Sequence, residues 1–226
     1  RRSSDLPKQP ILAIRKDAKN TLLIGIDGQG IWNISEKGDT ILHIYKEDLN
    51  NPFSLRGDGV YDILCDGSKN WIATFTGKLS FFENNNSQIT PVTYQINNPN
   101  SLGNNYVNQI IEDHEGHIWF ATNNGVSRWD AASNKWKHYY QNKSEQAKVF
   151  LSLCEDNQGH IWAGSYSSGI YLLDRETGKT LKHYSSKTNT PGFTGDFIFD
   201  FFVDKEGDVW IGGNQKLSCY LIKEDR

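Results

Sequence analysis

Short runs of β-branched and aromatic residues alternate with clusters of Gly, Asn and Pro along the chain. In the clearest unit, the run VNQIIED (107–113) reaches a turn and continues into a second run, HIWFAT (117–122). A third run, GVSRWD (125–130), and a more polar fourth, KWKHYY (135–140), complete the unit. Runs of this kind, bounded by turn-forming residues, predict β-strands, and the sustained i, i+3, i+4 apolar spacing of a helix is absent. We therefore expect four antiparallel strands in this unit.

The unit recurs along the chain in five copies. Four copies carry a Trp in the second run and the first carries a Leu: Leu23, Trp71, Trp119, Trp162 and Trp210. The copies are spaced by about 43–48 residues, which signals propeller blades or helical arrays, and the strand pattern selects blades. The sequence therefore predicts an all-β chain, 1–226, that is a single β-propeller segment of four-stranded antiparallel blades. The blades are expected at approximately residues 11–45, 60–95, 107–140, 149–184 and 197–226, and the last copy ends without a fourth strand.

The turn between the first two runs carries an acid and, in most copies, a Gly three residues later, as in Asp113 and Gly116. Asp favours the first position of a type I turn, and Gly favours the left-handed conformation at the fourth. The copy at Asp66 is one residue shorter and is expected to turn differently, and its Asn70 stands where better copies have Ile. We interpret the acids as turn residues, because five separated turns lack the alternating oxygen ligands of a calcium site.

Two residues after the Trp position, every copy has a small residue: Gly25, Ala73, Ala121, Gly164 and Gly212. A large ring beside a small residue favours face-to-face packing of sheets, because the neighbouring sheet has to approach closely. Burying one Trp contributes up to about 4–6 kcal/mol. We therefore expect the Trp column, rather than the acids, to dominate stability.

Composition narrows the classes of function. The 226 residues include 24 Lys and Arg against 27 Asp and Glu, without a basic run, so no nucleic-acid partner is expected. The chain has neither the apolar stretch of a membrane helix nor that of a signal peptide, and it contains no Met. We interpret it as a mature product, an excised segment or the ordered part of a longer chain. The three cysteines lack metal-ligand spacing, so we expect no metal and no other cofactor, and we interpret Cys65 and Cys154 as small buried hydrophobes.

The complete pattern resembles the two-component regulator propeller repeat. Residues 107–130 and 149–174 carry the Glu-Asp strand end, the Gly-x-Ile-Trp second strand and the Gly-led third strand. The linkers LNNPFSL (49–55) and INNPNSL (96–102) resemble the connectors between blades of that family, and the resemblance covers about residues 11 to 220.

The resemblance implies a piece of the periplasmic sensor region of a bacterial hybrid two-component histidine kinase, a type that often controls polysaccharide-utilisation genes. It implies partners within the same receptor, namely neighbouring propeller and immunoglobulin-like domains. A homodimer is a further candidate partner, which belongs to the alternative role in protein contacts. The family sensors use seven-bladed propellers, so five copies suggest part of a larger propeller, with a compact five-bladed ring as the alternative.

The turns between second and third strands vary among the copies, and they are expected on the same face as the long connectors between blades. They bring together amides, hydroxyls and rings, which suit the hydroxyls and the apolar face of a sugar. The candidate ligand-binding residues are Asp27, Gln29, Phe75, Asn123, Asn124, Tyr166, Asn214 and Gln215. Turn chemistry alone is the competing explanation for the polar residues, whereas turns do not require the aromatic rings of Phe75 and Tyr166.

No catalytic residue is assigned. His117 and His160 share one repeat position, and His138 and His183 share another, and repeated positions usually serve structure. We expect a non-enzymatic sensor segment that recognises an oligosaccharide. The alternatives are a scaffold for protein contacts or dimerisation, and a propeller enzyme of the streptogramin-lyase type.

Overall fold

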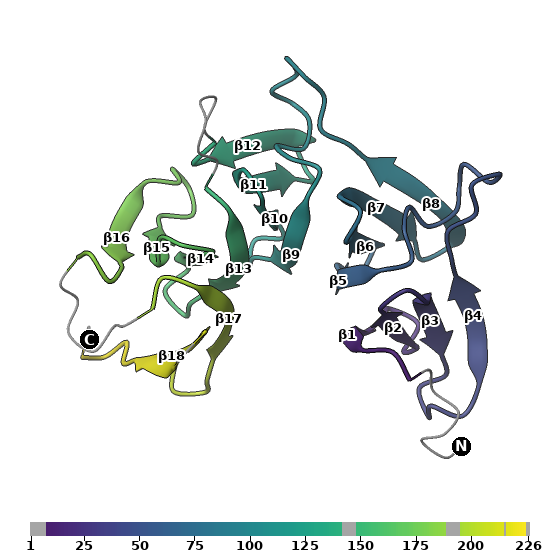
Figure 1. The fold of residues 1–226 in the computed structure, drawn as a ribbon, viewed down its shortest axis with the longest axis horizontal. Helices are drawn as coiled ribbons and strands as arrows, with labels where there is room; N and C mark the ends of the chain where they lie inside the picture. The colour runs from purple at the N-terminus through teal and green to yellow at the C-terminus, as the bar shows by residue number, and fades with distance from the viewer. Residues whose placement is uncertain (1–7, 142–147, 189–194, 215, 225–226) are drawn as a thin grey trace. The chain divides into compact units, whose positions relative to one another are not determined.

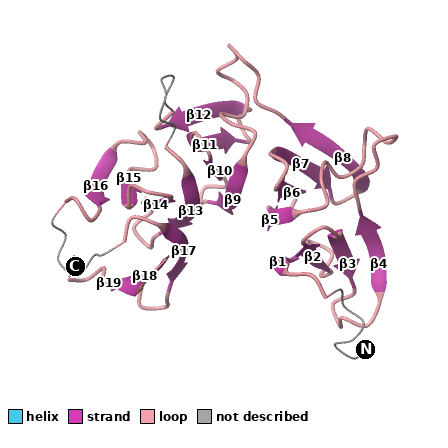
Figure 2. Ribbon diagram, viewed as in Figure 1, coloured by secondary structure: helices cyan, strands magenta, loops and turns pink. Residues whose placement is uncertain are grey.

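A computed structural model describes residues 8–141, 148–188, 195–214 and 216–224 (Figures 1 and 2). Within these residues, every element of regular secondary structure is a β-strand. The strands form five antiparallel sheets in which neighbours follow chain order, so the predicted all-β, blade-like architecture is confirmed. No described segment forms a helix with the length and hydropathy that crossing a membrane requires. The chain divides into two compact units, Arg1–Ile110 and Ile111–Arg226, and each is described by itself.

The first unit holds two four-stranded sheets. The first sheet contains β1 (Ile11–Lys16), β2 (Leu22–Ile26), β3 (Gly30–Ile34) and β4 (Ile41–Tyr45). The second sheet contains β5 (Val60–Cys65), β6 (Lys69–Thr74), β7 (Lys78–Glu83) and β8 (Asn86–Val92).

The third sheet begins with β9, which crosses the boundary at Ile110, and the other two sheets lie within the second unit. The third sheet contains β9 (Val107–Glu112), β10 (Ile118–Thr122), β11 (Gly125–Asp130) and β12 (Lys135–Tyr139). The fourth contains β13 (Phe150–Glu155), β14 (Ile161–Ser165), β15 (Ile170–Leu173) and β16 (Thr180–Tyr184). The fifth contains three described strands, β17 (Ile198–Val203), β18 (Val209–Gly213) and β19 (Leu217–Tyr220).

The Asp turns between first and second strands are built as predicted. The backbone N–H of Asp113 donates to the carbonyl four residues on, at 3.0 Å, and Gly116 has a φ of 83°. Asn20 replaces Gly in the first copy and adopts a φ of 62°. In the shorter copy, the N–H of Asp66 donates to the carbonyl three residues on, and the positive φ moves to Gly67. This turn therefore differs from the others, as expected.

The turn acids also hold the indole rings, which the sequence analysis did not anticipate. In four copies one carboxylate oxygen accepts a hydrogen bond from the indole N–H at 2.8–2.9 Å: Asp66 with Trp71, Asp113 with Trp119, Asp156 with Trp162, and Asp204 with Trp210. Burial alone would raise the pKa of the Asp113 carboxyl, but hydrogen bonds from Trp119 and His117 lower it overall. Acid and indole therefore act as one unit.

In the first, third and fourth sheets the Trp position of the second strand, Leu23, Trp119 or Trp162, packs against the following sheet. Trp119 clusters with Phe150 and Ile161 of the fourth sheet, and Trp162 clusters with residues of the fifth. Trp71, Trp119 and Trp162 are fully buried, whereas Trp210 is 38% exposed. Trp210 is therefore an exception to the burial expected of the Trp column, and no described sheet follows the fifth in chain order.

The small residues permit the close approach of sheets that was predicted. A Cβ at Gly25 would lie 2.8 Å from Cγ1 of Val60, and one at Gly164 would lie 2.6 Å from Cγ2 of Ile198. Both neighbours belong to the next sheet, and neither distance leaves room for a methyl group. At Gly212, in the fifth sheet, the nearest atom would lie 3.6 Å away, so Ala fits there.

The two Asn-Pro connectors fold alike. The hydroxyl of Ser54 accepts a hydrogen bond from the N–H of Asp48 at 3.0 Å, and Ser101 accepts one from Gln95 at 3.0 Å. The Leu after each serine is fully buried. The repeated Ser-Leu pair therefore closes the loop with a hydroxyl and anchors it with an apolar side chain.

Candidate functional site

The turns between second and third strands lie beside the segments that lead into first strands, as predicted. The N–H groups of Phe75 and Tyr166 each donate at 2.9 Å to the carbonyl just before the first strand of their own sheet. The N–H of Gly30 donates at 2.8 Å to the carbonyl of Asp58, which lies in the connector to the next sheet. These turns and connectors therefore share one end of the strands, and the Asp turns occupy the other.

Three of the candidate ligand-binding residues fall in the first unit. Asp27 and Gln29 lie in the turn between β2 and β3, where Gln29 Oε1 accepts a hydrogen bond from Lys46 Nζ at 3.2 Å. Phe75 is partly exposed, and its ring centroid lies 3.8 Å from that of Tyr61. Tyr61 is also exposed, at an irregularity in the pairing of β5 with β6. The two rings therefore form an accessible aromatic pair at this end of the second sheet.

The remaining candidates belong to the second half of the chain. Asn123, Asn124, Tyr166 and Asn214 fall in the second unit, and Gln215 lies outside the described residues. Tyr166 is half-exposed and contacts the ring of Phe197 edge-on, at a centroid distance of 4.8 Å. The N–H of Asn124 donates to Oγ1 of Thr122 at 3.1 Å.

Hydroxyl groups close several of these turns. Thr74 donates to the carbonyl of Lys78 at 3.1 Å, and Thr122 donates to the carbonyl of Gly125 at 2.7 Å. Ser165 accepts a hydrogen bond from a backbone N–H three residues on, at 2.7 Å. Turn chemistry therefore explains these hydroxyls, whereas it leaves the rings of Phe75 and Tyr166 unexplained.

A groove of about 500 Å³ lies beside the β6–β7 turn, within the first unit. Its lining comprises Arg56, Thr76, Gly77, Lys78, Leu79, Pro91, Thr93, Asn105 and Tyr106. Tyr106 is 51% exposed and lies directly over Gly77, where a Cβ would be 2.7 Å from its ring. Gly77 has a φ of 70°, so both its conformation and this close contact favour glycine. Tyr106 is thus an exposed ring held in place by the turn below it.

Arg56 supplies hydrogen-bond donors at the edge of this groove. Its Nη2 donates to the carbonyl of Pro52 at 2.6 Å, and its own carbonyl accepts from Thr76 at 2.9 Å. Its Nε is buried and has no hydrogen-bond partner among the described residues. Sequence analysis missed Arg56 and Tyr106; an aromatic residue ending the polar connector NNY (104–106) is the signal that could have found Tyr106.

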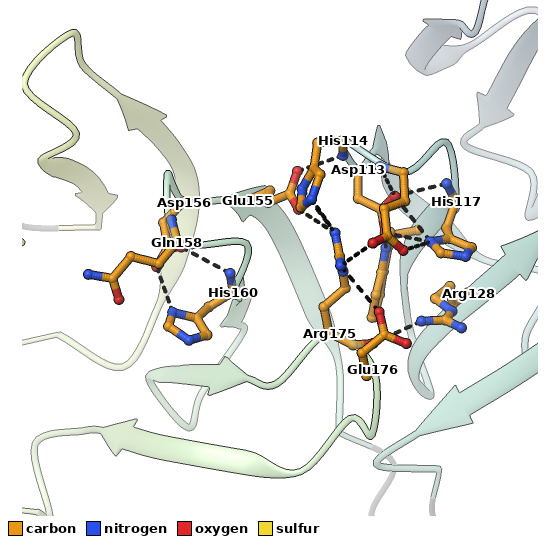
Figure 3. Close-up of polar contacts among 12 residues, drawn as sticks. Asp113, His114, His117, Arg128, Glu155, Asp156, Gln158, His160, Arg175 and Glu176 are labelled. Atoms are coloured by element: carbon orange, nitrogen blue, oxygen red, sulfur yellow. Dashed lines mark hydrogen bonds and ion pairs between the residues drawn. The ribbon is translucent and has the colours of Figure 1, made fainter.

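A network of charged residues joins the third and fourth sheets within the second unit (Figure 3). Arg175, in the turn after β15, lies 2.6 Å from a carboxylate oxygen of Glu115 and 3.5 Å from one of Glu155. His114 completes the network, since its N–H donates to Glu155 at 2.8 Å and its ring contacts Arg175. Burial would lower the pKa of Arg175, but the carboxylates, Glu115 first, raise it overall. These groups pair with one another, which indicates a structural link between sheets.

The His residues at repeated positions all bond to groups of their own sheets or turns. His117 and His160 place Nδ1 at 3.0 and 3.3 Å from the turn acids Asp113 and Asp156. His138 Nδ1 lies 3.0 Å from Ser127 Oγ, and His183 Nε2 lies 2.7 Å from a backbone carbonyl. Each repeated His thus has a local structural contact.

The three cysteines are free thiols, and two of them pack with apolar clusters. Cys65 packs against the cluster between the first two sheets, and Cys154 packs against that between the fourth and fifth. Burial raises the pKa of Cys65 to about 12 and also raises that of Cys154. Both thiols therefore stay protonated near neutral pH, in agreement with their interpretation as small hydrophobes. Among the described residues, no group of three or more His, Cys, Asp or Glu is placed to hold a metal ion.

Solved structures share this fold. The extracellular domain of the hybrid two component system BT3049 from B. thetaiotaomicron matches with a TM-score of 0.82 and 20% identity, over 100% of this chain and 31% of that one. The extracellular domain of BT4673 from the same organism matches with a TM-score of 0.52 and 19% identity, over 98% of this chain and 37% of that one. A streptogramin B lyase matches with a TM-score of 0.66 and 16% identity, over 98% and 68% of the two chains.

At these identities the likeness shows the fold alone, and the chain spans under a third of the BT3049 domain's length. No curated protein matches the sequence. Three segments match the family described as two component regulator propeller, at residues 101–124, 144–167 and 192–215. The chain is therefore a β-propeller segment whose matched repeats are similar to those of the two component regulator propeller family.

Proposed function

We propose that the chain is a non-enzymatic sensor segment of a two-component signalling receptor, placed on the periplasmic side of the inner membrane. Its repeat family and the fold it shares with extracellular domains of two component systems support this proposal. Any kinase activity belongs to a longer parent protein. The segment passes on ligand occupancy by packing against neighbouring propeller and immunoglobulin-like domains, or against a second copy of the receptor.

The ligand we propose is an oligosaccharide bound in the groove beside the β6–β7 turn. The observation that carries this proposal is the exposed ring of Tyr106, held over Gly77 and next to Arg56 and Asn105. An aromatic face suits the apolar face of a sugar, and guanidinium and amide groups suit its hydroxyls. About 500 Å³ falls within the roughly 300–1,000 Å³ range typical of ligand pockets.

Calorimetric titration of the protein with a panel of plant and host oligosaccharides tests this proposal. We expect one of them to bind, and Tyr106→Ala to weaken its binding at least tenfold, about 1.4 kcal/mol. Tyr94→Ala is the matched control, because Tyr94 is an exposed tyrosine of the same connector that does not line the groove. The Tyr94→Ala variant should bind the same oligosaccharide with the affinity of the wild type.

The alternatives predict other results. A scaffold would bind none of the panel and would change its mass with concentration. A lyase-type enzyme would convert its ligand during long incubation, which would contradict a purely sensing role.

A further inference from the structure

The contact between the first two sheets departs twice from the repeat. In the third and fourth sheets, the indole of Trp119 and the side chain of Ile161 belong to one apolar cluster. At the corresponding positions of the first and second sheets stand Leu23, which is smaller than Trp, and Asn70, which is polar. This contact therefore lacks the apolar volume that fills the other one.

The side chain of Asn70 is buried, and hydrogen bonds with its neighbours fix the orientation of its amide group. It is 1% exposed and lies between Cys65 and Phe82 on the adjacent strands. Its Nδ2 donates to Oδ1 of Asn84 at 2.9 Å, while Nδ2 of Asn84 donates to the carbonyl of Gly67 at 2.7 Å. Since a backbone carbonyl only accepts, Asn84 has to offer its oxygen to Asn70. Oδ1 of Asn70 is thereby left without a donor among the described residues.

A second amide and a carboxylate add acceptors on the side of the first sheet. Oδ1 of Asn33 is buried and likewise has no donor among the described residues. Burial raises the pKa of Tyr45, and an interaction with the side chain of Asn33 partly opposes the rise. Asp17 lacks an indole partner because Leu23 follows it, and its Oδ2 accepts from the Thr21 hydroxyl at 2.8 Å instead.

These groups line a pocket of about 250 Å³ that opens at the Asp-turn end of the sheets. Tyr45 and Phe82 form an apolar wall, with ring centroids 4.7 Å apart, and the Asn-rich β7–β8 turn forms the rim. The volume is well above the roughly 30 Å³ of one water molecule and just below the roughly 300 Å³ lower limit of pockets for larger ligands. It suits one small molecule.

We propose that this pocket binds a single small polyhydroxylated molecule of about one sugar ring. Its hydroxyls donate to Oδ1 of Asn33 and of Asn70, with the Asp17 carboxylate as a further acceptor, and its apolar face lies against Tyr45 or Phe82. An acceptor buried without a donor is costly, so a ligand rich in donors is the chemistry that this pocket favours. The pocket is a second site, separate from the Tyr106 groove at the opposite end of the strands.

Saturation-transfer NMR with D-glucose, D-galactose, D-mannose, L-arabinose and glycerol at millimolar concentration tests the proposal. At least one of these should receive saturation from the wild-type protein. Asn70→Ile, which installs the residue of the better copies, should abolish the signal while raising Tm in the absence of sugar. Tyr106→Ala should keep the signal, which separates this site from the oligosaccharide groove.

Asn33→Leu is the second variant, because Leu172 takes the corresponding position opposite Trp162, and it should also abolish the signal. A wild-type protein that saturates none of the five compounds would overturn the proposal, as would a signal that survives in Asn70→Ile. If Asn70→Ile raises Tm although the wild-type protein binds none of the compounds, the pocket holds only ordered water, and the proposal is likewise overturned.

Discussion

Two contacts between neighbouring sheets use the same repeat positions with opposite chemistry. Between the third and fourth sheets, Trp119 and Ile161 belong to an apolar cluster, and the indole is held by a turn acid. Between the first and second sheets, Leu23 and Asn70 stand at those positions beside a polar pocket. The first sheets still pack through an apolar cluster that includes Val60. The first two sheets therefore pack together without a Trp at this position. The residues that line this contact are then available for another role.

The largest effect is expected at a buried indole. Trp162→Ala should lower the free energy of unfolding by about 3–5 kcal/mol, because it leaves a cavity against the fifth sheet. Trp210→Ala is the matched control, since the same repeat position is partly exposed there, and its cost should be less than half as large. Urea unfolding of both variants measures the difference, and equal losses would refute the role assigned to the following sheet.

The next effect is expected at a turn acid. Asp113→Ala should cost about 2–4 kcal/mol, because it removes hydrogen bonds to a charged group and leaves the buried indole N–H of Trp119 unpaired. The folded-state pKa of Asp113 is lowered, so its contribution is present above the unfolded value of about 3.9 and is lost as pH falls through the folded value.

Wild-type stability should therefore fall on acidification below about pH 4, and less steeply in Asp113→Ala. Unfolding followed by tryptophan fluorescence across this range measures both slopes. Glu206→Ala, an acid of the exposed last turn, is the control and should keep the wild-type slope. Identical slopes in wild type and Asp113→Ala would show that the turn acid is not linked to folding.

A smaller effect is expected where sheets approach closely. Gly164→Ala should cost about 1–3 kcal/mol, because the new methyl would lie 2.6 Å from Ile198 and 2.4 Å from Ser152 Oγ. Gly212→Ala has no neighbour closer than 3.6 Å and should be neutral or slightly stabilising. Thermal unfolding of the two variants measures the difference in Tm. An unchanged Tm in Gly164→Ala would show that the fourth and fifth sheets can move apart without cost.

The repeat made much of this fold predictable. Strand runs, the Asp turn and the small residue after the Trp all follow from local pattern, because each depends on neighbours in sequence. The exposure of Trp210 was not predicted, since it depends on whether another sheet covers it. The link from turn acid to indole was also missed, because the pattern does not show which way a ring nitrogen points.

The candidate site was less predictable than the fold. The phase of the turns placed Phe75 at the connector end of the second sheet, whereas Tyr106 and Arg56 line the groove there from separate connectors. Asn70 was visible as a departure from the repeat, but its meaning depends on Asn33 and Asn84, which lie far from it in sequence. Such groupings arise from side-chain packing between strands, which strand periodicity alone does not encode.

The most direct test of the contrast between the two contacts is a reciprocal exchange, followed by urea unfolding. Asn70→Ile should raise the free energy of unfolding by about 1–2 kcal/mol, because it removes a buried acceptor that lacks a donor. Ile161→Asn should lower it by about 2–4 kcal/mol, because it places an amide in the apolar cluster around Trp119. A loss of stability in Asn70→Ile as large as that in Ile161→Asn would contradict the view that the first contact has exchanged packing for a polar pocket.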